Sequence, residues 1–220
     1  MNNTKAEYQK RLDEVEMYFN TIKVLDLGMC KIVCTDILGN QTERRIDDEL
    51  SKVLKANGFL LLYNLIEATI RNSISAIFGA MHAQDMTFKK LTDNLRKIWI
   101  NQEVKNLKKE ELLSLFSIIL EDKLIKFKAE CVNISGNIDA QRIRDIAKQF
   151  GYSESRDGRD LVTIKEKRNK LAHGEFTFSE IGKDYSVSEL IKFKDNTKDY
   201  LQDVLINIEN YINNKAYVQL

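Results

Sequence analysis

The residues best suited to chemistry lie in one segment, Arg168-Asn169-Lys170-Leu171-Ala172-His173. Gly174 follows it as a glycine often follows the end of a helix, which predicts that His173 closes a helix. The helix dipole stabilises a protonated imidazole at that end, which suits a general acid or base near neutral pH. Arg168 adds a permanently charged, planar guanidinium that fits a phosphate. The pair indicates phosphate chemistry such as RNA cleavage through the 2′-hydroxyl, where one group moves protons and the other stabilises charge.

The spacing within this segment limits how its side chains meet. Asn169 lies four residues before His173, so the two share a helix face. Arg168 lies about 140° from His173 on an ideal helix and has to bend round to join it. Residues 156–170 hold six basic and three acidic residues, and we take Lys165 and Lys170 as substrate-binding candidates. A terminal histidine before a capping glycine is also an ordinary helix end, so that alternative stays open.

A second polar feature lies in the most apolar stretch of the chain, residues 59–78. Asn64, Glu67, Arg71 and Ser75 fall within an arc of about 80° on a helix. One interpretation is an ion pair between Glu67 and Arg71, four residues apart. The other is that Asn64 and Glu67 line the same cleft as the segment around His173. The residues alone favour neither.

The remaining reactive residue types suggest no further centre. Cys30, Cys34 and Cys131 lack CxxC spacing and a nearby histidine, so we expect no zinc site and no other metal or cofactor. We expect these cysteines to be buried in a reducing cytosol. His82 is expected at the surface or as a helix cap, and Trp99 in the core.

Bulk composition narrows the class of protein. The 34 lysines and arginines nearly balance the 33 aspartates and glutamates. The net charge therefore creates no overall positive electrostatic field that would favour nucleic acid, and any site for a polyanion has to be a local basic patch. Hydrophobic residues make up 43%, and the absence of proline favours long helices. The charged N-terminus is unlike a signal peptide, and no apolar run reaches about 18 residues. We therefore expect a cytoplasmic protein that makes no use of a membrane.

Apolar periodicity predicts an all-α protein with one domain over residues 1–220, comprising a core at about 44–212 and an N-terminal helix and connection at 1–43. The expected helices span residue 4 to the mid-twenties, 44–80 with its weakest point at 57–58, 87–98, 113–127, a short helix ending near 150–151, 158–173 and about 190–211. The 26–41 region is expected to be a connection, Thr87 or Asp85 a cap, residues 135–139 a capping turn, and 176–188 a loop or small irregular extension.

Arg168-Asn169-x-x-x-His173 resembles the Arg-polar-x-x-x-His motif of the HEPN superfamily (higher eukaryotes and prokaryotes nucleotide-binding domains). Two further stretches, LYNLIEA at 62–68 and SGNID at 135–139, resemble a prokaryotic HEPN-like nuclease branch of defence and toxin systems, as does the wider sequence at 164–175. Together these stretches extend over more than half of the chain. The short motif gains its specificity from the accompanying stretches.

The resemblance implies an up-and-down helical bundle of HEPN type with additional helices, and a homodimer whose two motifs form one composite site. It implies a metal-independent endoribonuclease, acting as a toxin or antiviral effector, whose products carry 2′,3′-cyclic phosphate and 5′-hydroxyl ends. Arg168 and His173 would be catalytic, Asn169 would orient them, and an antitoxin or other regulatory protein would be a partner.

One position departs from some HEPN toxins. These carry a tyrosine two residues after the histidine, which a partner nucleotidyltransferase modifies, whereas this chain has Glu175. Inhibition by that route is therefore not expected. Two rival hypotheses remain: a non-catalytic HEPN module that binds RNA, a nucleotide or a protein, and a structural helical adaptor.

Overall fold

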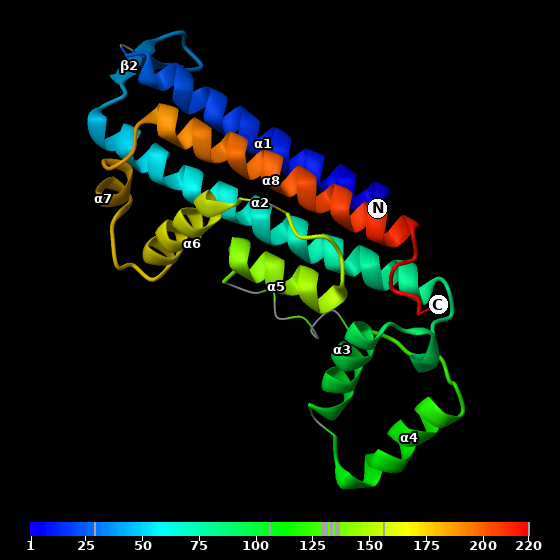
Figure 1. The fold of residues 1–220 in the computed structure, drawn as a ribbon. Helices are drawn as coiled ribbons and strands as arrows, with labels where there is room; N and C mark the ends of the chain where they lie inside the picture. Colours follow the sequence, from blue (N-terminus) through cyan, green and yellow to red (C-terminus); the bar gives the residue numbers. More distant parts are fainter. Residues whose placement is uncertain are drawn as a thin grey trace. The chain divides into compact units, whose positions relative to one another are not determined.

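Helices dominate the structure, which is a computed structural model (Figure 1). It describes residues 1–28, 30–105, 107–128, 132, 134, 137–155 and 157–219. The helical content confirms the predicted all-α class. The described residues also form one small antiparallel sheet, which was not predicted. In chain order the elements are α1 (Asn2–Asp26), β1 (Lys31–Thr35), β2 (Gln41–Arg45), α2 (Asp48–His82), the 3-10 turn η1 (Phe88–Lys90), α3 (Asp93–Val104), the 3-10 turn η2 (Lys109–Glu111), α4 (Leu112–Leu120), α5 (Ala140–Phe150), α6 (Arg159–Ala172), α7 (Phe178–Gly182) and α8 (Val187–Asn213).

The chain divides into two compact units that are interleaved in sequence. The first, here called the motif unit, comprises residues 8–66 and 158–199 and contains the Arg168-to-His173 segment. The second unit comprises residues 1–7, 67–157 and 200–220. Helices α1, α2 and α8 each contribute residues to both units.

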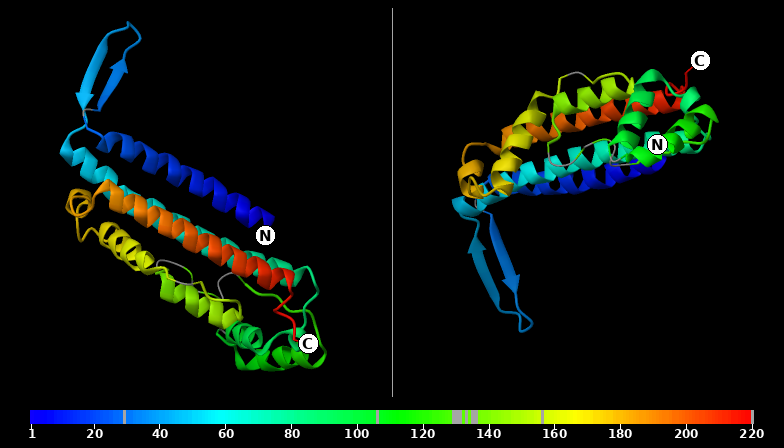
Figure 2. Two further views of the ribbon diagram at one scale, coloured as in Figure 1. Left: turned by 45° about the horizontal axis from the view of Figure 1, so that its top comes forward. Right: turned by 90° about the horizontal axis from the view of Figure 1, so that it is seen from below.

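In the motif unit, α1 packs beside α2 and α8 (Figures 1 and 2). The apolar residues that repeat at helical spacing along α1 are each at most 5% exposed, as that spacing predicted: Tyr8, Leu12, Val15, Phe19 and Ile22. The ring of Phe19 reaches α2 at Gly58, where a Cβ atom would lie 3.2 Å from the ring. Gly58 therefore permits close helix packing, and α2 runs through this position without ending.

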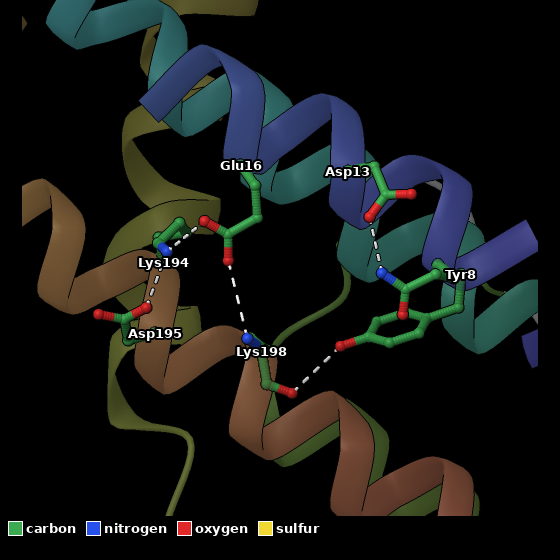
Figure 3. Close-up of polar contacts among 7 residues, drawn as sticks. Tyr8, Asp13, Glu16, Lys194, Asp195 and Lys198 are labelled. Carbon is green, nitrogen blue, oxygen red and sulfur yellow. Dashed lines mark hydrogen bonds and ion pairs between the residues drawn. The ribbon is translucent and has the colours of Figure 1, made fainter. Parts of the chain in front are cut away.

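Polar contacts also join α1 to α8 within the motif unit (Figure 3). The Lys194 ammonium lies 2.6 Å from a Glu16 carboxylate oxygen and 2.8 Å from one of Asp195. Burial alone would lower the pKa of Lys194, but the hydrogen bonds to Asp195 and Glu16 outweigh burial and raise it. The Tyr8 hydroxyl donates to the Lys198 carbonyl at 3.3 Å. The first and last long helices are thus joined by charge as well as by apolar packing.

A β-hairpin replaces the connection expected between the first two helices. Lys31 pairs with Arg45 and Thr35 with Gln41, and both strands are exposed along their whole length. The turn is held by the Asp36 carboxylate, which accepts hydrogen bonds from the backbone N–H groups of Leu38 and Asn40. The expected helix start near residue 44 is therefore wrong, since α2 begins at Asp48.

The expectation that the cysteines are buried is wrong for the two that lie in the hairpin region. Cys30, just before β1, is half-buried, and Cys34, within β1, is exposed. Apolar burial was inferred from the general behaviour of free cysteine, and a two-stranded hairpin without a covering layer offers no interior to bury it. Cys131 lies outside the described residues.

In the second unit, one helix forms as predicted and two differ from the prediction. Helix α5 begins after Asp139, whose carboxylate accepts from the Arg142 N–H, and ends at Gly151 with φ +87°. Residues 135–136 of the predicted capping turn lie outside the described residues. The helix expected over 87–98 is instead η1 followed by α3, and the one expected to reach 127 ends as α4 at Leu120.

Two other expectations are met in this unit. Trp99 is 2% exposed, in the core. His82 lies exposed at the end of α2, where its Nε2 accepts a hydrogen bond from the Phe127 N–H at 3.0 Å. His82 therefore has a structural role at a helix end.

By length and composition alone, α2 is apolar enough to cross a membrane, although no long uninterrupted apolar run was found in the sequence. Half of its most apolar window is buried inside the protein, as is normal for a core helix of a soluble protein.

Candidate active site at the end of helix α6

The end of α6 fixes the backbone of the candidate histidine. The His173 N–H donates to the Asn169 carbonyl at 2.9 Å, and the Gly174 N–H donates to the Leu171 carbonyl. The Glu175 N–H reaches back to the Lys170 carbonyl at 3.0 Å, and Gly174 has φ +68°. This is the Schellman arrangement, so the predicted helix end is confirmed and His173 is its last, capping residue.

Arg168 lies on the buried side of α6, because it continues a stripe of apolar residues. Leu161, Ile164 and Leu171 are at most 8% exposed, and on an ideal helix Arg168 falls within about 60° of all three. Its guanidinium is nevertheless partnered. Nη1 donates to the Asn169 amide oxygen at 3.0 Å, and Cζ lies 4.4 Å from the centre of the Tyr63 ring on α2. A hydrogen bond and a cation–π contact thus hold the charge in a half-buried position.

The His173 side chain, by contrast, is exposed. It follows Arg168 by five residues, about 140° round the helix axis, while Asn169 lies between the two directions. The structure brings Arg168 and Asn169 together and presents His173 toward solvent. The imidazole is therefore accessible to solvent, and the guanidinium is oriented by its neighbours.

Aromatic residues of the motif unit surround the end of α6. The Lys167 ammonium lies 5.4 Å from the centre of the Tyr185 ring, which packs edge-on against Phe59 at 4.9 Å. The Lys55 ammonium donates to the Tyr185 carbonyl at 2.8 Å. These contacts tie α6 to α2 and to the segment before α8, which positions the motif.

A second basic residue lies beside an accessible ring. The Lys170 ammonium is 4.9 Å from the centre of the Phe176 ring, and Phe176 is 44% exposed. The segment containing this ring is kept close to α6 by the tight turn at Gly174. The predicted binding residue Lys170 is therefore placed next to an exposed aromatic face.

The polar stripe of α2 faces mainly outward. Asn64, Arg71 and Ser75 are exposed, and Glu67 is half-buried. The Arg11 guanidinium of α1 donates to the Asn64 amide oxygen at 3.3 Å, and Arg71 pairs with Glu67 at 2.6 Å. The ion pair considered from the sequence is therefore present. Glu67 belongs to the second unit, and the cleft shared with Arg168 and His173 stays a prediction.

Helix α6 is locally basic in a chain of balanced charge. It carries five basic and two acidic residues, and the carboxylate of one acid, Asp160, accepts from the Asn196 amide at 2.6 Å. Lys165 lies half-buried on the same helix. Across the part of the chain that the structure describes, no group of three His, Cys, Asp or Glu side chains is arranged to hold a metal ion.

One family model, HEPN_MAE_28990-like HEPN, matches residues 3–217. The chain belongs to the HEPN superfamily. No curated protein and no solved structure matches it. The match includes α1, α8 and the whole of the Arg168-to-His173 motif, so the resemblance inferred from short stretches extends to nearly the full chain.

Tyr63 is a residue of this candidate site that sequence reasoning missed. It is 2% exposed, and its place in an apolar helix is the pattern of an ordinary core aromatic. The feature of the sequence that could have identified Tyr63 is its position in the LYNLIEA stretch, directly before Asn64. In the structure the ring supports the Arg168 guanidinium, while its neighbour Asn64 contacts α1.

Proposed function

We propose that this HEPN protein is a metal-independent endoribonuclease. The observation that carries the proposal is the arrangement at the end of α6: a guanidinium oriented by Asn169 and Tyr63, one turn away from an exposed imidazole on a rigid cap. Cleavage through the 2′-hydroxyl uses a fixed cation and groups that transfer protons, and each chain supplies one of each kind. The surrounding basic residues of α6 favour a polyanionic substrate.

The proposed reaction needs a proton taken from one oxygen and a proton given to another. His173, as a neutral imidazole, accepts the proton of the 2′-hydroxyl while that oxygen attacks phosphorus. The P–O5′ bond breaks, and the 5′-oxygen leaves with a proton supplied by a general acid. The products are a 2′,3′-cyclic phosphate and a 5′-hydroxyl end. Arg168 stabilises the charge that develops on the non-bridging phosphate oxygens.

A homodimer would supply both proton-transfer groups. Each chain has one His173, and Arg168 is held on a different side of α6. A second copy that places its own α6 opposite the first would offer two imidazoles and two guanidiniums to one phosphate. It would also double the local positive charge without changing the balanced charge of each chain. We therefore propose a composite site formed by two chains.

The test uses purified protein and a labelled RNA in EDTA. Wild type is expected to cleave, whereas His173→Ala and Arg168→Ala are each expected to lose about 10²-fold or more in rate while remaining folded. His82→Gln is the matched control, because it replaces the other histidine and keeps an acceptor for the Phe127 N–H. Cleavage that persists in both motif variants overturns the site. RNA binding without turnover in wild type favours the non-catalytic module.

The proposed biological role, as a toxin or antiviral effector, follows from this ribonuclease activity. A toxin or antiviral effector in the cytoplasm would degrade cellular or invading RNA, and a regulatory protein would restrain it. Mapping RNA ends after induced expression of wild type and His173→Ala identifies the target. Ends that appear with wild type alone support the role, and identical end maps argue against it.

A further inference from the structure

A basic pocket lies in the second unit, away from the candidate motif in sequence and composed of other residues. Helices α3 and α5 pack together there and line an open pocket of about 520 Å³. That volume is within the range of small-molecule sites. The pocket is lined by Asn94, Lys97, Ile98, Asn101, Val132, Arg142, Lys148 and Gln149.

The charge of this α3–α5 pocket is one-sided. Lys97, Arg142 and Lys148 contribute three cations, and no carboxylate is found among the described residues that line it. Several cations round one space raise the local positive potential, which favours an anion there. The pocket therefore has the electrostatic character of an anion site.

Three nearby carboxylates offer little compensation to the two lysines, Lys97 and Lys148. Asp93 on α3 pairs with Arg96 at 3.0 Å, and the Asp145 carboxylate on α5 accepts from Gln141 at 2.8 Å. Glu154 approaches Lys148 only to 3.8 Å, and both side chains are well exposed, so solvent weakens this pair. These three acids are thus directed to other partners or held at the edge of the pocket.

The rest of the lining suits a ligand with polar groups. The side chains of Asn94, Asn101 and Gln149 supply amide donors, and such groups hydrogen-bond to phosphate oxygens. The Asn94 amide also donates to the Lys148 carbonyl at 3.2 Å, which links α3 to α5 beside the cavity. Two helices joined at this point hold their basic side chains round a common space.

We propose that the α3–α5 pocket binds a ligand that carries two or more phosphate groups. A free oligophosphate compound and the backbone of an RNA strand are the two sources of this chemistry. Three cations from two helices match several negative charges better than one, and the amides complete the contacts to phosphate oxygens. The pocket shares no residue with the Arg168–His173 site, so this binding does not depend on cleavage.

The test measures binding by calorimetry to sodium tripolyphosphate and, separately, to a single-stranded RNA decamer. All proteins carry His173→Ala so that the RNA stays intact. The pocket variant is Lys97→Gln/Lys148→Gln, in which both replaced side chains are exposed. The control is Lys109→Gln/Lys123→Gln, which removes the same charge from exposed positions outside the pocket. Thermal unfolding confirms that each variant is folded.

The pocket variant is expected to raise the Kd of the bound probe by about tenfold for each cation removed, and the control to change it little. If RNA is the ligand, the slope of log K against log salt becomes shallower by about 0.7 per cation. Weakening with one probe assigns the source, and weakening with both shows a site that accepts either. Three outcomes overturn the proposal: no binding of either probe by the parent protein, equal affinity of the parent and the pocket variant, or equal losses in the pocket and control variants.

Discussion

The Arg168 guanidinium lies 4.4 Å from the centre of the Tyr63 ring, between α6 and α2 of the motif unit. Tyr63 is almost fully buried, and Arg168 occupies a place in the apolar stripe of its own helix. The ring face attracts the cation where water is largely excluded. This contact, together with the Asn169 amide, determines where the positive charge of Arg168 lies.

Replacing Tyr63 tests that positioning. Tyr63→Phe keeps the ring face and is expected to retain most RNA cleavage, whereas Tyr63→Leu removes the cation–π contact and should lower kcat by roughly 3- to 30-fold. The KM for RNA should change less than kcat, because the overall charge of α6 is unaltered. Equal kcat values for the two variants, measured at matched folded fractions, contradict a positioning role.

The backbone at Gly174 offers a second test. Its φ of +68° is unfavourable for residues with a Cβ, although no atom lies within 4 Å of where a Cβ would sit. Gly174→Ala should therefore destabilise by about 1 kcal/mol through backbone strain alone, and Gly174→Asn by less. Cleavage should fall in the same order, since this turn sets the position of His173. Calorimetric melting and cleavage rates check both series, and an alanine variant that equals wild type in each contradicts the argument.

Two glycines should respond to alanine in opposite directions. A Cβ at Gly182 of α7 would lie 1.9 Å from the Lys52 carbonyl oxygen, so the backbone has to move, at a cost of about 2 kcal/mol or more. A Cβ at Gly79 of α2 meets nothing within 4 Å, and alanine favours a helix by about 1 kcal/mol. Urea unfolding is expected to show Gly182→Ala less stable and Gly79→Ala more stable than wild type. The same sign for both would show that close approach at Gly182 is relieved elsewhere.

Alkaline pH should unfold the protein through its buried tyrosines. Burial, aided by Asp199 and Glu16, raises the pKa of Tyr8 to about 12, and burial likewise raises that of Tyr200 to about 12. Because these folded-state pKa values exceed the ordinary value of 10, the stabilisation they reflect is complete below pH 10. It is lost as pH rises from 10 through 12.

Urea unfolding from pH 8 to 12, with phenolate absorbance recorded in parallel, measures this effect. Stability should be level up to about pH 10 and then fall. Tyr8→Phe should make the fall shallower, although it also loses the hydrogen bond to the Lys198 carbonyl. Full ionisation of the tyrosines near pH 10 in the folded protein would contradict the expectation.

The sequence predicted those helices whose apolar stripe and ends are both marked by side chains. Helix α1 has five regularly spaced core residues, and α5 is bounded by the cap Asp139 and the left-handed Gly151. Helix α6 is bounded instead by two glycines with positive φ, Gly158 and Gly174. Periodicity and capping act locally, so they can be recognised without knowledge of the partner elements.

The elements that were missed lack such marks. Both strands of the hairpin are exposed along their whole length and bury no face, so the sequence shows no alternation of apolar and polar residues that would predict them. Helix α4 was extended too far because Leu124 and Phe127 continue its apolar spacing. The chain leaves the helix before them, and Asp122 adopts φ +55°. Apolar spacing predicts burial in some element and does not by itself determine where the helix stops.

The candidate site was predicted only in part for a related reason. Residue spacing placed His173 at a helix end and Asn169 on its face, and both follow from helix geometry. The partner of Arg168 is Tyr63, on a helix far earlier in the chain, and the partner of Asn64 is Arg11 on α1. Such pairings depend on tertiary packing, which short motifs do not encode.

The pairing of α1 with α8 has a consequence for folding during synthesis of the protein. Tyr8 and Lys198 are 190 residues apart, and Glu16 and Lys194 are 178 apart. At translation rates of about 5 to 20 residues per second, roughly 10 to 40 seconds separate the synthesis of the two helices. Throughout that interval the apolar stripe of α1 lacks its partner on α8 and is open to chaperones or to aggregation. The motif unit can close only after the first part of α8 has been synthesised, so a chain that stops before α8 leaves this unit unassembled.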